Sequence, residues 1–214
     1  KEFEKIDFDI IGIKVITSPI VSRAIMVSEV AKELGKKVVW GGPHPTILPK
    51  QSLEHPAVDA VVIGEAENSF LDLINHYRNR NGSKLLGCGI KDSSNKITIM
   101  PPREEFVNLD DLPIPSWDLV DDIDRYFPYR KDNIVPIATS RGCIFNCGFC
   151  HQANENVNAY GGRFRVMSAK KMLKEFDVVD NLTKKHLSRI YLLSDLHLAN
   201  PTYVRNFCNE MVES

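Results

Sequence analysis

Short, almost wholly apolar segments alternate with amphipathic segments in the first part of the chain, and this alternation limits the possible folds most strongly. Residues 9–16 are nearly all apolar, as expected for a strand that is buried on both faces of a parallel sheet. Residues 37–40 and 59–64 repeat the pattern. Between the first two segments, apolar residues recur at helical spacing from Ser18, a capping residue, to Gly35, a terminating residue. Strand, helix and strand in this order predict right-handed βαβ crossovers over a parallel sheet.

Small or polar residues directly follow the three predicted strands: Thr17 and Ser18, Gly41 and Gly42, and Gly64 with Glu65. Ligands of parallel sheets bind beyond the carboxyl ends of the strands, where these residues fall. Gly41 and Gly42 have no side chains, so a bulky ligand can approach their backbone, and the hydroxyl of Thr17 or Ser18 can hydrogen-bond it. The alternative is that the paired glycines only form a tight turn after the strand. We expect His44, which follows closely, to be a turn or surface histidine.

The pattern changes after residue 82. Residues 86–101 predict a hairpin whose turn is formed by residues 92–95. Proline-rich residues then have the composition of a linker, and a second α/β part follows it. In this part the predicted elements are strands at 133–139 and 189–193 and helices at 168–183 and 201–212. We therefore predict an α/β domain at 1–105, a linker at 106–131 and a second α/β domain at 132–214.

Three cysteines at spacings of four and three residues, Cys143, Cys147 and Cys150, lie in a loop after a predicted strand. Three thiolates at this spacing can surround one compact metal centre. An iron–sulfur cube has four irons, so three protein ligands leave one iron open to bind a small molecule and pass it an electron. The alternative is zinc, which needs a fourth ligand that His197 or Cys208 would supply. Cys88 and Cys208 lie outside the motif, and we expect both to be packed thiols.

Composition excludes several classes of protein. Lys and Arg number 27 and Asp and Glu 28, so there is no basic excess to neutralise a phosphate backbone, and we expect no nucleic-acid partner. The longest apolar runs are strand-like, so we expect no membrane span. Five cysteines, three of them crowded together, suit a metal better than a disulfide scaffold. No charged-then-apolar leader follows Lys1, and the predicted location is therefore cytoplasmic.

The CxxxCxxC pattern, with an aromatic residue before its last cysteine, closely resembles the radical S-adenosylmethionine (radical SAM) superfamily. In that family three cysteines hold a [4Fe–4S] cluster, whose open iron chelates the amino and carboxylate groups of SAM. Reductive cleavage of SAM then gives methionine and a 5′-deoxyadenosyl radical. The resemblance implies that Cys143, Cys147 and Cys150 are the cluster ligands and that Phe149 lies near the adenine of SAM.

The resemblance continues on both sides of the following helix. Residues 160–165 resemble the segment that leads into the first helix of the family, and residues 189–195 resemble its second strand. The end of that strand helps to orient the SAM amino group, which implies this role for Ser194 and Asp195. Their alternative role is a polar strand end and a cap for the helix that begins near Pro201. The implied partners are a small-molecule substrate and a reductant such as flavodoxin or ferredoxin.

The first half of the chain resembles the cobalamin-binding domain that precedes the radical SAM barrel in a large subfamily. Residues 9–13, 40–46 and 62–67 follow the order and spacing of that domain. The resemblance implies contacts with cobalamin from four residues, Thr17, Ser18, Gly41 and Gly42. It also implies the fold class: α/β, with a partial Rossmann-like parallel sheet of the cobalamin-binding type followed by the start of a radical SAM (β/α) partial barrel.

Relatives in that subfamily have further strands before the first domain and further strand–helix units after the second. We therefore expect either a fragment of a longer enzyme or sheet edges that another chain completes. The implied activity is radical chemistry, methyl transfer or ring formation, on a substrate that the sequence does not identify. A non-catalytic module that binds a cluster or cobalamin and a structural zinc protein remain the alternatives.

Overall fold

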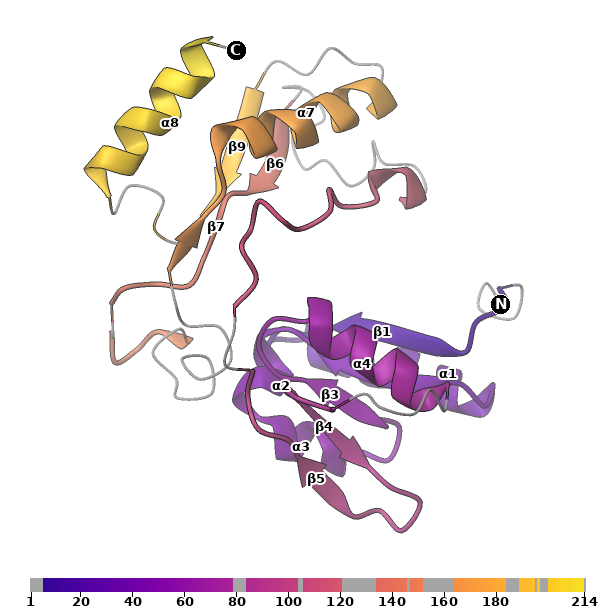
Figure 1. The fold of residues 1–214 in the computed structure, drawn as a ribbon. Coiled ribbons are helices and arrows are strands. Elements are labelled where there is room, and N and C mark those ends of the chain that lie inside the picture. The colour runs from indigo at the N-terminus through magenta and orange to yellow at the C-terminus, as the bar shows by residue number, and fades with distance from the viewer. Residues whose placement is uncertain are drawn as a thin grey trace. The chain divides into compact units, whose positions relative to one another are not determined.

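The computed structural model describes residues 6–78, 84–103, 106–120, 134–145, 147–151, 164–183, 189–194, 196 and 200–213. The chain divides into two compact units (Figure 1). The first comprises Lys1–Glu105 with Phe145–Gly162, and the second comprises Phe106–Ile144 with Arg163–Ser214. In the described part of the chain, no helix combines the length and the apolar character that a membrane crossing requires.

The first unit is built on a sheet that, among the described residues, has five strands in the order β1-β2-β3-β4-β5. These strands are β1 (Ile10–Lys14), β2 (Lys37–Gly41), β3 (Ala60–Val62), β4 (Cys88–Lys91) and β5 (Ile97–Ile99). The first three are parallel, whereas β4 and β5 form an antiparallel hairpin that continues the sheet from β3. Its helices are α1 (Ile20–Glu33), α2 (Pro43–Ile47), α3 (Pro49–Glu54) and α4 (Glu67–Tyr77). The predicted parallel sheet and hairpin are both confirmed, and the short helices α2 and α3 were not predicted.

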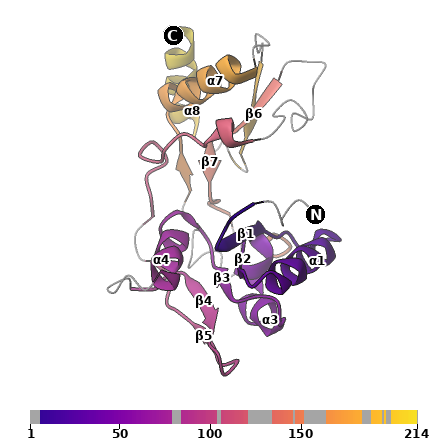
Figure 2. The same ribbon diagram turned by 90° about the vertical axis from the view of Figure 1, so that its right-hand side faces the viewer.

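Helices cover both faces of this sheet (Figure 2). Alternate residues of β2 point to opposite faces, because side chains of a strand alternate. Val38 and Trp40 pack in a core with α1 and α3 residues such as Leu53. Val39 packs in a second core with Leu73 of α4. The continuous apolar character of β2 is thus explained by burial on both faces, as predicted for strands of this sheet.

Burial on both faces is only partial for β1, where Ile13 packs against one core and Ile10 against the other. Its residues are half-buried or exposed, including Gly12 and Lys14, which are exposed. The reason is position: among the described strands β1 pairs only with β2 and lies at an edge of the sheet. The apolar run can be recognised in the sequence of the segment itself. Whether the strand lies at the edge or in the centre of the sheet depends on which strands pair with it.

The predicted end of the first helix is confirmed at Gly35. This residue has a φ of +72°, and the N–H groups of Gly35 and Lys36 donate to the carbonyls of Lys32 and Ala31, both over 2.9 Å. These two bonds form a Schellman motif, in which glycine adopts the left-handed conformation at low cost. At the other end, the Ser18 hydroxyl accepts a hydrogen bond from the Ile20 N–H over 3.2 Å.

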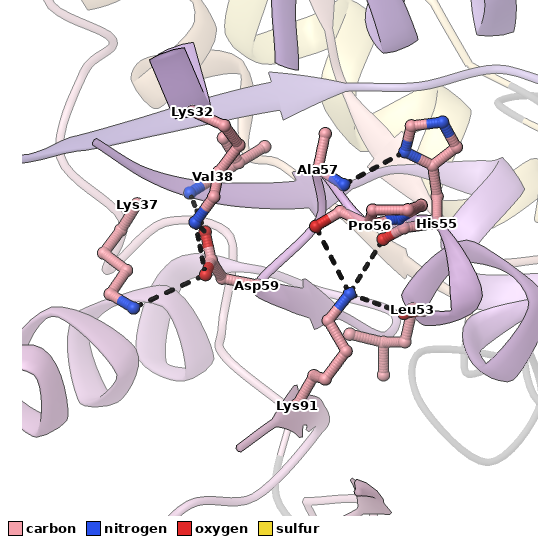
Figure 3. Close-up of polar contacts among 9 residues, drawn as sticks. All are labelled: Lys32, Lys37, Val38, Leu53, His55, Pro56, Ala57, Asp59 and Lys91. Carbon is pink, nitrogen blue, oxygen red and sulfur yellow. Dashed lines mark hydrogen bonds and ion pairs between the residues drawn. The ribbon is translucent and has the colours of Figure 1, made fainter. Parts of the chain in front are cut away.

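A carboxylate at the amino end of β3 connects α1, β2 and β3 (Figure 3). Asp59 accepts hydrogen bonds from Lys32 Nζ at 2.8 and 2.9 Å and from the Val38 N–H at 2.9 Å. Lys37 Nζ lies 3.4 Å from the same carboxylate. Burial by itself would raise the pKa of Asp59, but these donors outweigh burial and hold the pKa below its usual value. Nearby, Lys91 Nζ donates to the carbonyls of Leu53 and His55.

We predict that Asp59→Asn lowers the free energy of unfolding by about 1.5–3 kcal/mol at pH 7, the range for hydrogen bonds to a charged group. Because the folded pKa lies below the unfolded one, the ionised carboxylate stabilises the protein above the unfolded value of about 4. This stabilisation is lost as the pH falls through the folded pKa. Urea unfolding of the two proteins should therefore show a difference that shrinks below about pH 4. Asp9→Asn, an exposed matched change, should show little difference at any pH; an equal effect there would contradict the assignment.

The second unit contains a two-stranded parallel sheet of β6 (Ile134–Ala138) and β9 (Arg189–Leu193). Its helices are α7 (Ala169–Thr183) and α8 (Pro201–Glu213), which match the predicted helices. Ser168 caps α7, since its hydroxyl accepts from the Lys171 N–H over 3.2 Å. A short antiparallel pair, β7 (Ser140–Arg141) with β8 (Arg165–Val166), was not predicted.

The first half of the predicted linker packs in the second unit. Leu109 is 2% exposed and belongs to the same core as β6 and α7. Trp117, in the 3₁₀ helix η2 (Trp117–Leu119), donates from Nε1 to Glu175 Oε1 over 3.1 Å. Burial raises the pKa of Glu175. Proline-rich composition indicates an irregular backbone, but it does not exclude anchoring by Leu109 and Trp117. Residues 121–131 lie outside the described residues.

Candidate cofactor sites

Backbone hydrogen bonds join the segments that follow β1 and β2. The Val15 N–H donates to the Gly41 carbonyl over 2.8 Å, and the His44 N–H donates to the Val15 carbonyl over 3.0 Å. Thr46 then connects β2 to β3, because its hydroxyl donates to the Gly42 carbonyl and accepts from the Gly64 N–H. The structure thus brings the carboxyl ends of the three parallel strands together at one edge, and Thr46 is a connection that the sequence did not reveal.

The two glycines at this edge differ in whether the backbone requires the absence of a side chain. Gly42 has a φ of +93° and a ψ of −170°, and a Cβ there would lie 3.1 Å from the Val15 carbonyl oxygen and from Lys14 Cγ. Its lack of a side chain is required by the tight turn of the chain itself. At Gly41 the nearest atom to an added Cβ is Val62 Cβ at 3.9 Å. At Gly41 an added Cβ would make only an ordinary van der Waals contact, so the tight turn does not require the absence of a side chain there.

The two hydroxyl groups that were predicted to bind a ligand, those of Thr17 and Ser18, differ in their hydrogen-bond partners. The Ser18 hydroxyl is engaged locally, with the Ile20 N–H and with the Ile16 carbonyl. Thr17 is exposed, and its Oγ1 lies 2.9 Å from Nδ1 of His44. His44 was expected to be a turn or surface residue, but it is only 9% exposed. The correction follows from α2, which turns back so that the ring lies beneath the loop after β1.

The three cysteines of the motif are present as thiols rather than in disulfides. Cys143 and Cys150 are half-buried and Cys147 is exposed. The Cys150 N–H donates to the Cys147 carbonyl over 2.9 Å, which closes a tight turn between these two residues. Within the ranges that the structure describes, no group of three or more His, Cys, Asp or Glu side chains is close enough to hold a metal ion. The donor chemistry of three thiols fits a cluster with one open iron, and their role as ligands stays a prediction.

The structure describes the two cysteines outside the motif, one of which was a candidate fourth ligand for zinc. Cys88 is fully buried, as expected, and burial raises its pKa to about 11. Cys208 is exposed on α8, so the expectation of a packed thiol is wrong for this residue. The outward face of a surface helix has no core to pack into. His197, the other candidate for a fourth zinc ligand, lies outside the described residues.

Phe149, expected near the adenine of SAM, is 94% exposed. Ile144 and Phe145 of the same loop are also more than half exposed. Large apolar side chains are rarely this exposed together unless they contact a ligand or a partner. The exposure leaves Phe149 accessible for stacking, and its contact with SAM stays a prediction.

Ser194 follows β9, and its hydroxyl is hydrogen-bonded to the hydroxyl of Ser140 in β7. The backbone holds these ends together, because the Thr139 N–H donates to the Leu193 carbonyl over 3.1 Å. The alternative role of Ser194 as a cap of α8 is wrong: Asn200 Oδ1 accepts from the first N–H groups of that helix. Asp195 and residues 160–163 lie outside the described residues. The sequence did not single out Ser140, which only the pairing of β6 with β9 brings to Ser194.

Comparisons with known proteins show similarity along most of the chain. Residues 1–74 match the B12 binding domain family. An uncharacterized methyltransferase of Pyrococcus horikoshii is 37% identical over 186 residues, which cover 84% of this chain and 38% of that protein. The anaerobic magnesium-protoporphyrin IX monomethyl ester cyclase of Rubrivivax gelatinosus is 29% identical over 219 residues, covering 96% of this chain and 37% of that protein.

Among solved structures, the cobalamin-dependent S-adenosylmethionine radical enzyme OxsB, with aqua-cobalamin and S-adenosylmethionine bound, superposes with a TM-score of 0.69. The match has 21% identity and covers 96% of this chain and 29% of OxsB, so it is a likeness of fold. The chain spans less than two fifths of the length of the two curated relatives.

The fold and the cysteine loop thus define a class: an α/β unit of the cobalamin-binding type joined to a unit of the radical SAM type. The chain is similar to members of the cobalamin-binding-domain-containing subfamily of the radical SAM superfamily.

Proposed function

We propose that the protein carrying this chain is a cobalamin-linked radical SAM enzyme, acting on a small molecule by methyl transfer or ring formation. The observation that carries the proposal is the CxxxCxxC loop after β6, with its three cysteines present as thiols. The relatives named as a methyltransferase and a cyclase support both reaction types. We further propose a first domain at 1–105, a connection at 106–131, a second domain at 132–214, and a cytoplasmic location.

In the second domain, Cys143, Cys147 and Cys150 would hold the [4Fe–4S] cluster. When bound, the cluster supplies one electron, received from a reductant such as flavodoxin or ferredoxin, that cleaves SAM to methionine and a 5′-deoxyadenosyl radical. Phe149 offers an exposed ring for the adenine. Ser194, held by Ser140, would orient the SAM amino group together with Asp195.

In the first domain, cobalamin would lie at the carboxyl edge of β1, β2 and β3. Gly41 has no side chain to obstruct a ligand, and Thr17 presents an exposed hydroxyl that is hydrogen-bonded to the His44 ring. Ser18 and Gly42 would shape the same edge, Ser18 by ending its loop at α1 and Gly42 by permitting the tight turn. These residues would bind and orient the ligand, in addition to the structural roles that Ser18 and Gly42 have at this edge.

Anaerobic reconstitution with iron and sulfide, followed by absorption and electron paramagnetic resonance spectra, tests the proposal on the complete protein that carries this sequence. A band near ~400 nm is expected, and the signal of the reduced cluster should change when SAM binds the open iron. Hydroxocobalamin should bind with a saturable spectral change. A colourless protein with stoichiometric zinc would support the structural zinc alternative, and a cluster that does not respond to SAM would support a non-catalytic module.

A further inference from the structure

His44 is fixed in place by contacts on several sides. Its N–H donates to the Val15 carbonyl, and its own carbonyl accepts from the Leu48 N–H over 2.9 Å. Its ring lies 6.3 Å from the ring of Trp40, measured between centroids, and only 9% of the residue is exposed. Such a residue has little freedom to move when a ligand arrives.

The side chain that His44 holds is exposed. Thr17 Oγ1 lies 2.9 Å from His44 Nδ1, at the edge where the three parallel strands end. A hydroxyl group has one donor and two acceptor positions, so the bond to His44 leaves capacity for a second partner. Burial lowers the pKa of His44, so its ring stays neutral at pH 7 and can serve as the partner of a neutral hydroxyl.

The hydrogen bond has a structural role, because it satisfies a ring nitrogen of the nearly buried His44. The Thr17 hydroxyl itself is exposed at the edge of the sheet, where it can have a second role. A fixed hydroxyl is useful when a ligand must be met in one orientation, because the entropy of ordering it has already been spent in folding. Ser18, the neighbouring hydroxyl, is engaged with the Ile20 N–H instead.

We propose that His44 is a positioning residue, which orients the Thr17 hydroxyl for a hydrogen bond to the nucleotide tail of cobalamin. This inference rests on the proposed function. The tail carries phosphate and ribose oxygens that can accept from or donate to a hydroxyl. The inference assigns to His44 a role through Thr17 and no direct contact with the ligand.

The test is a titration of the complete protein with hydroxocobalamin, and in parallel with cobinamide, which lacks the nucleotide tail. Thr17→Val and His44→Ala should each weaken hydroxocobalamin binding about three- to tenfold, the range for one neutral hydrogen bond. The double variant should bind hydroxocobalamin no more weakly than whichever single variant has the lower affinity. Both changes act on the same hydrogen bond, from the Thr17 hydroxyl to the nucleotide tail. Cobinamide binding should be unaffected by either change.

A conservative variant separates positioning from folding. Asn places a polar atom near the position of Nδ1, so His44→Asn should bind hydroxocobalamin within about twofold of the wild type. Thermal unfolding and circular dichroism check that each variant is folded, and Thr17→Val alters only an exposed side chain. Additive losses in the double variant, or equal losses with cobinamide, would overturn the inference while leaving cobalamin binding intact. A wild-type protein that binds no hydroxocobalamin would instead remove the proposed function, and the inference with it.

Discussion

Replacing Cys147 with alanine should abolish retention of the iron–sulfur cluster. Three thiolates already leave one iron of a cube without a protein ligand, so two thiolates cannot hold it. The loss should be complete rather than partial, and Cys143→Ala and Cys150→Ala should behave in the same way. Iron and sulfide content after anaerobic reconstitution and desalting, together with absorption near ~400 nm, measures it.

Cys208→Ala is the matched control, because Cys208 is also an exposed cysteine but lies on α8, outside the motif. It should retain iron and sulfide as the wild type does. If Cys208→Ala loses iron as completely as Cys147→Ala, the cluster has four protein ligands. The open iron, and with it the radical SAM chemistry, would then have no basis.

The Gly42→Ala variant should be the most damaging single-methyl change at the carboxyl edge of the first sheet. The backbone of Gly42, with φ of +93° and ψ of −170°, lies in a region that only glycine adopts readily. An added Cβ would also lie 3.1 Å from the Val15 carbonyl oxygen, which is fixed by the His44 N–H. Together we expect a loss of about 2–3 kcal/mol in the free energy of unfolding, measured by urea denaturation.

Gly41→Ala provides the control one residue away. An added Cβ there meets nothing closer than 3.9 Å, and Gly41 has no positive φ. Its free energy of unfolding should stay within about 0.5 kcal/mol of the wild type, as for most changes that meet no obstacle. The pair also decides how cobalamin titrations are interpreted. Weaker binding by a folded Gly41 variant reports on the ligand, whereas weaker binding by a Gly42 variant reports on the fold. Equal destabilisation of both variants would contradict the distinction.

Local signals in the sequence were enough to predict most helices and strands. The cap at Ser168, the terminating Gly35 and the turn of the hairpin act through hydrogen bonds between near neighbours. Such signals are complete within a few residues, so they can be read before the fold is known. The short helices α2 and α3 were missed because they have only five and six residues and no side-chain cap.

The candidate sites also combine features that local sequence predicts with features that depend on the tertiary structure. The spacing of Cys143, Cys147 and Cys150 is a property of consecutive residues, and the sequence by itself determined it together with the order of the two α/β units. Only the tertiary structure decided that β1 lies at an edge of the described strands, that His44 is buried next to Thr17 and that Ser140 meets Ser194. Each of these depends on which strands lie side by side. Pairing between distant segments is set by the packing of the whole sheet, and no local pattern of residues encodes it.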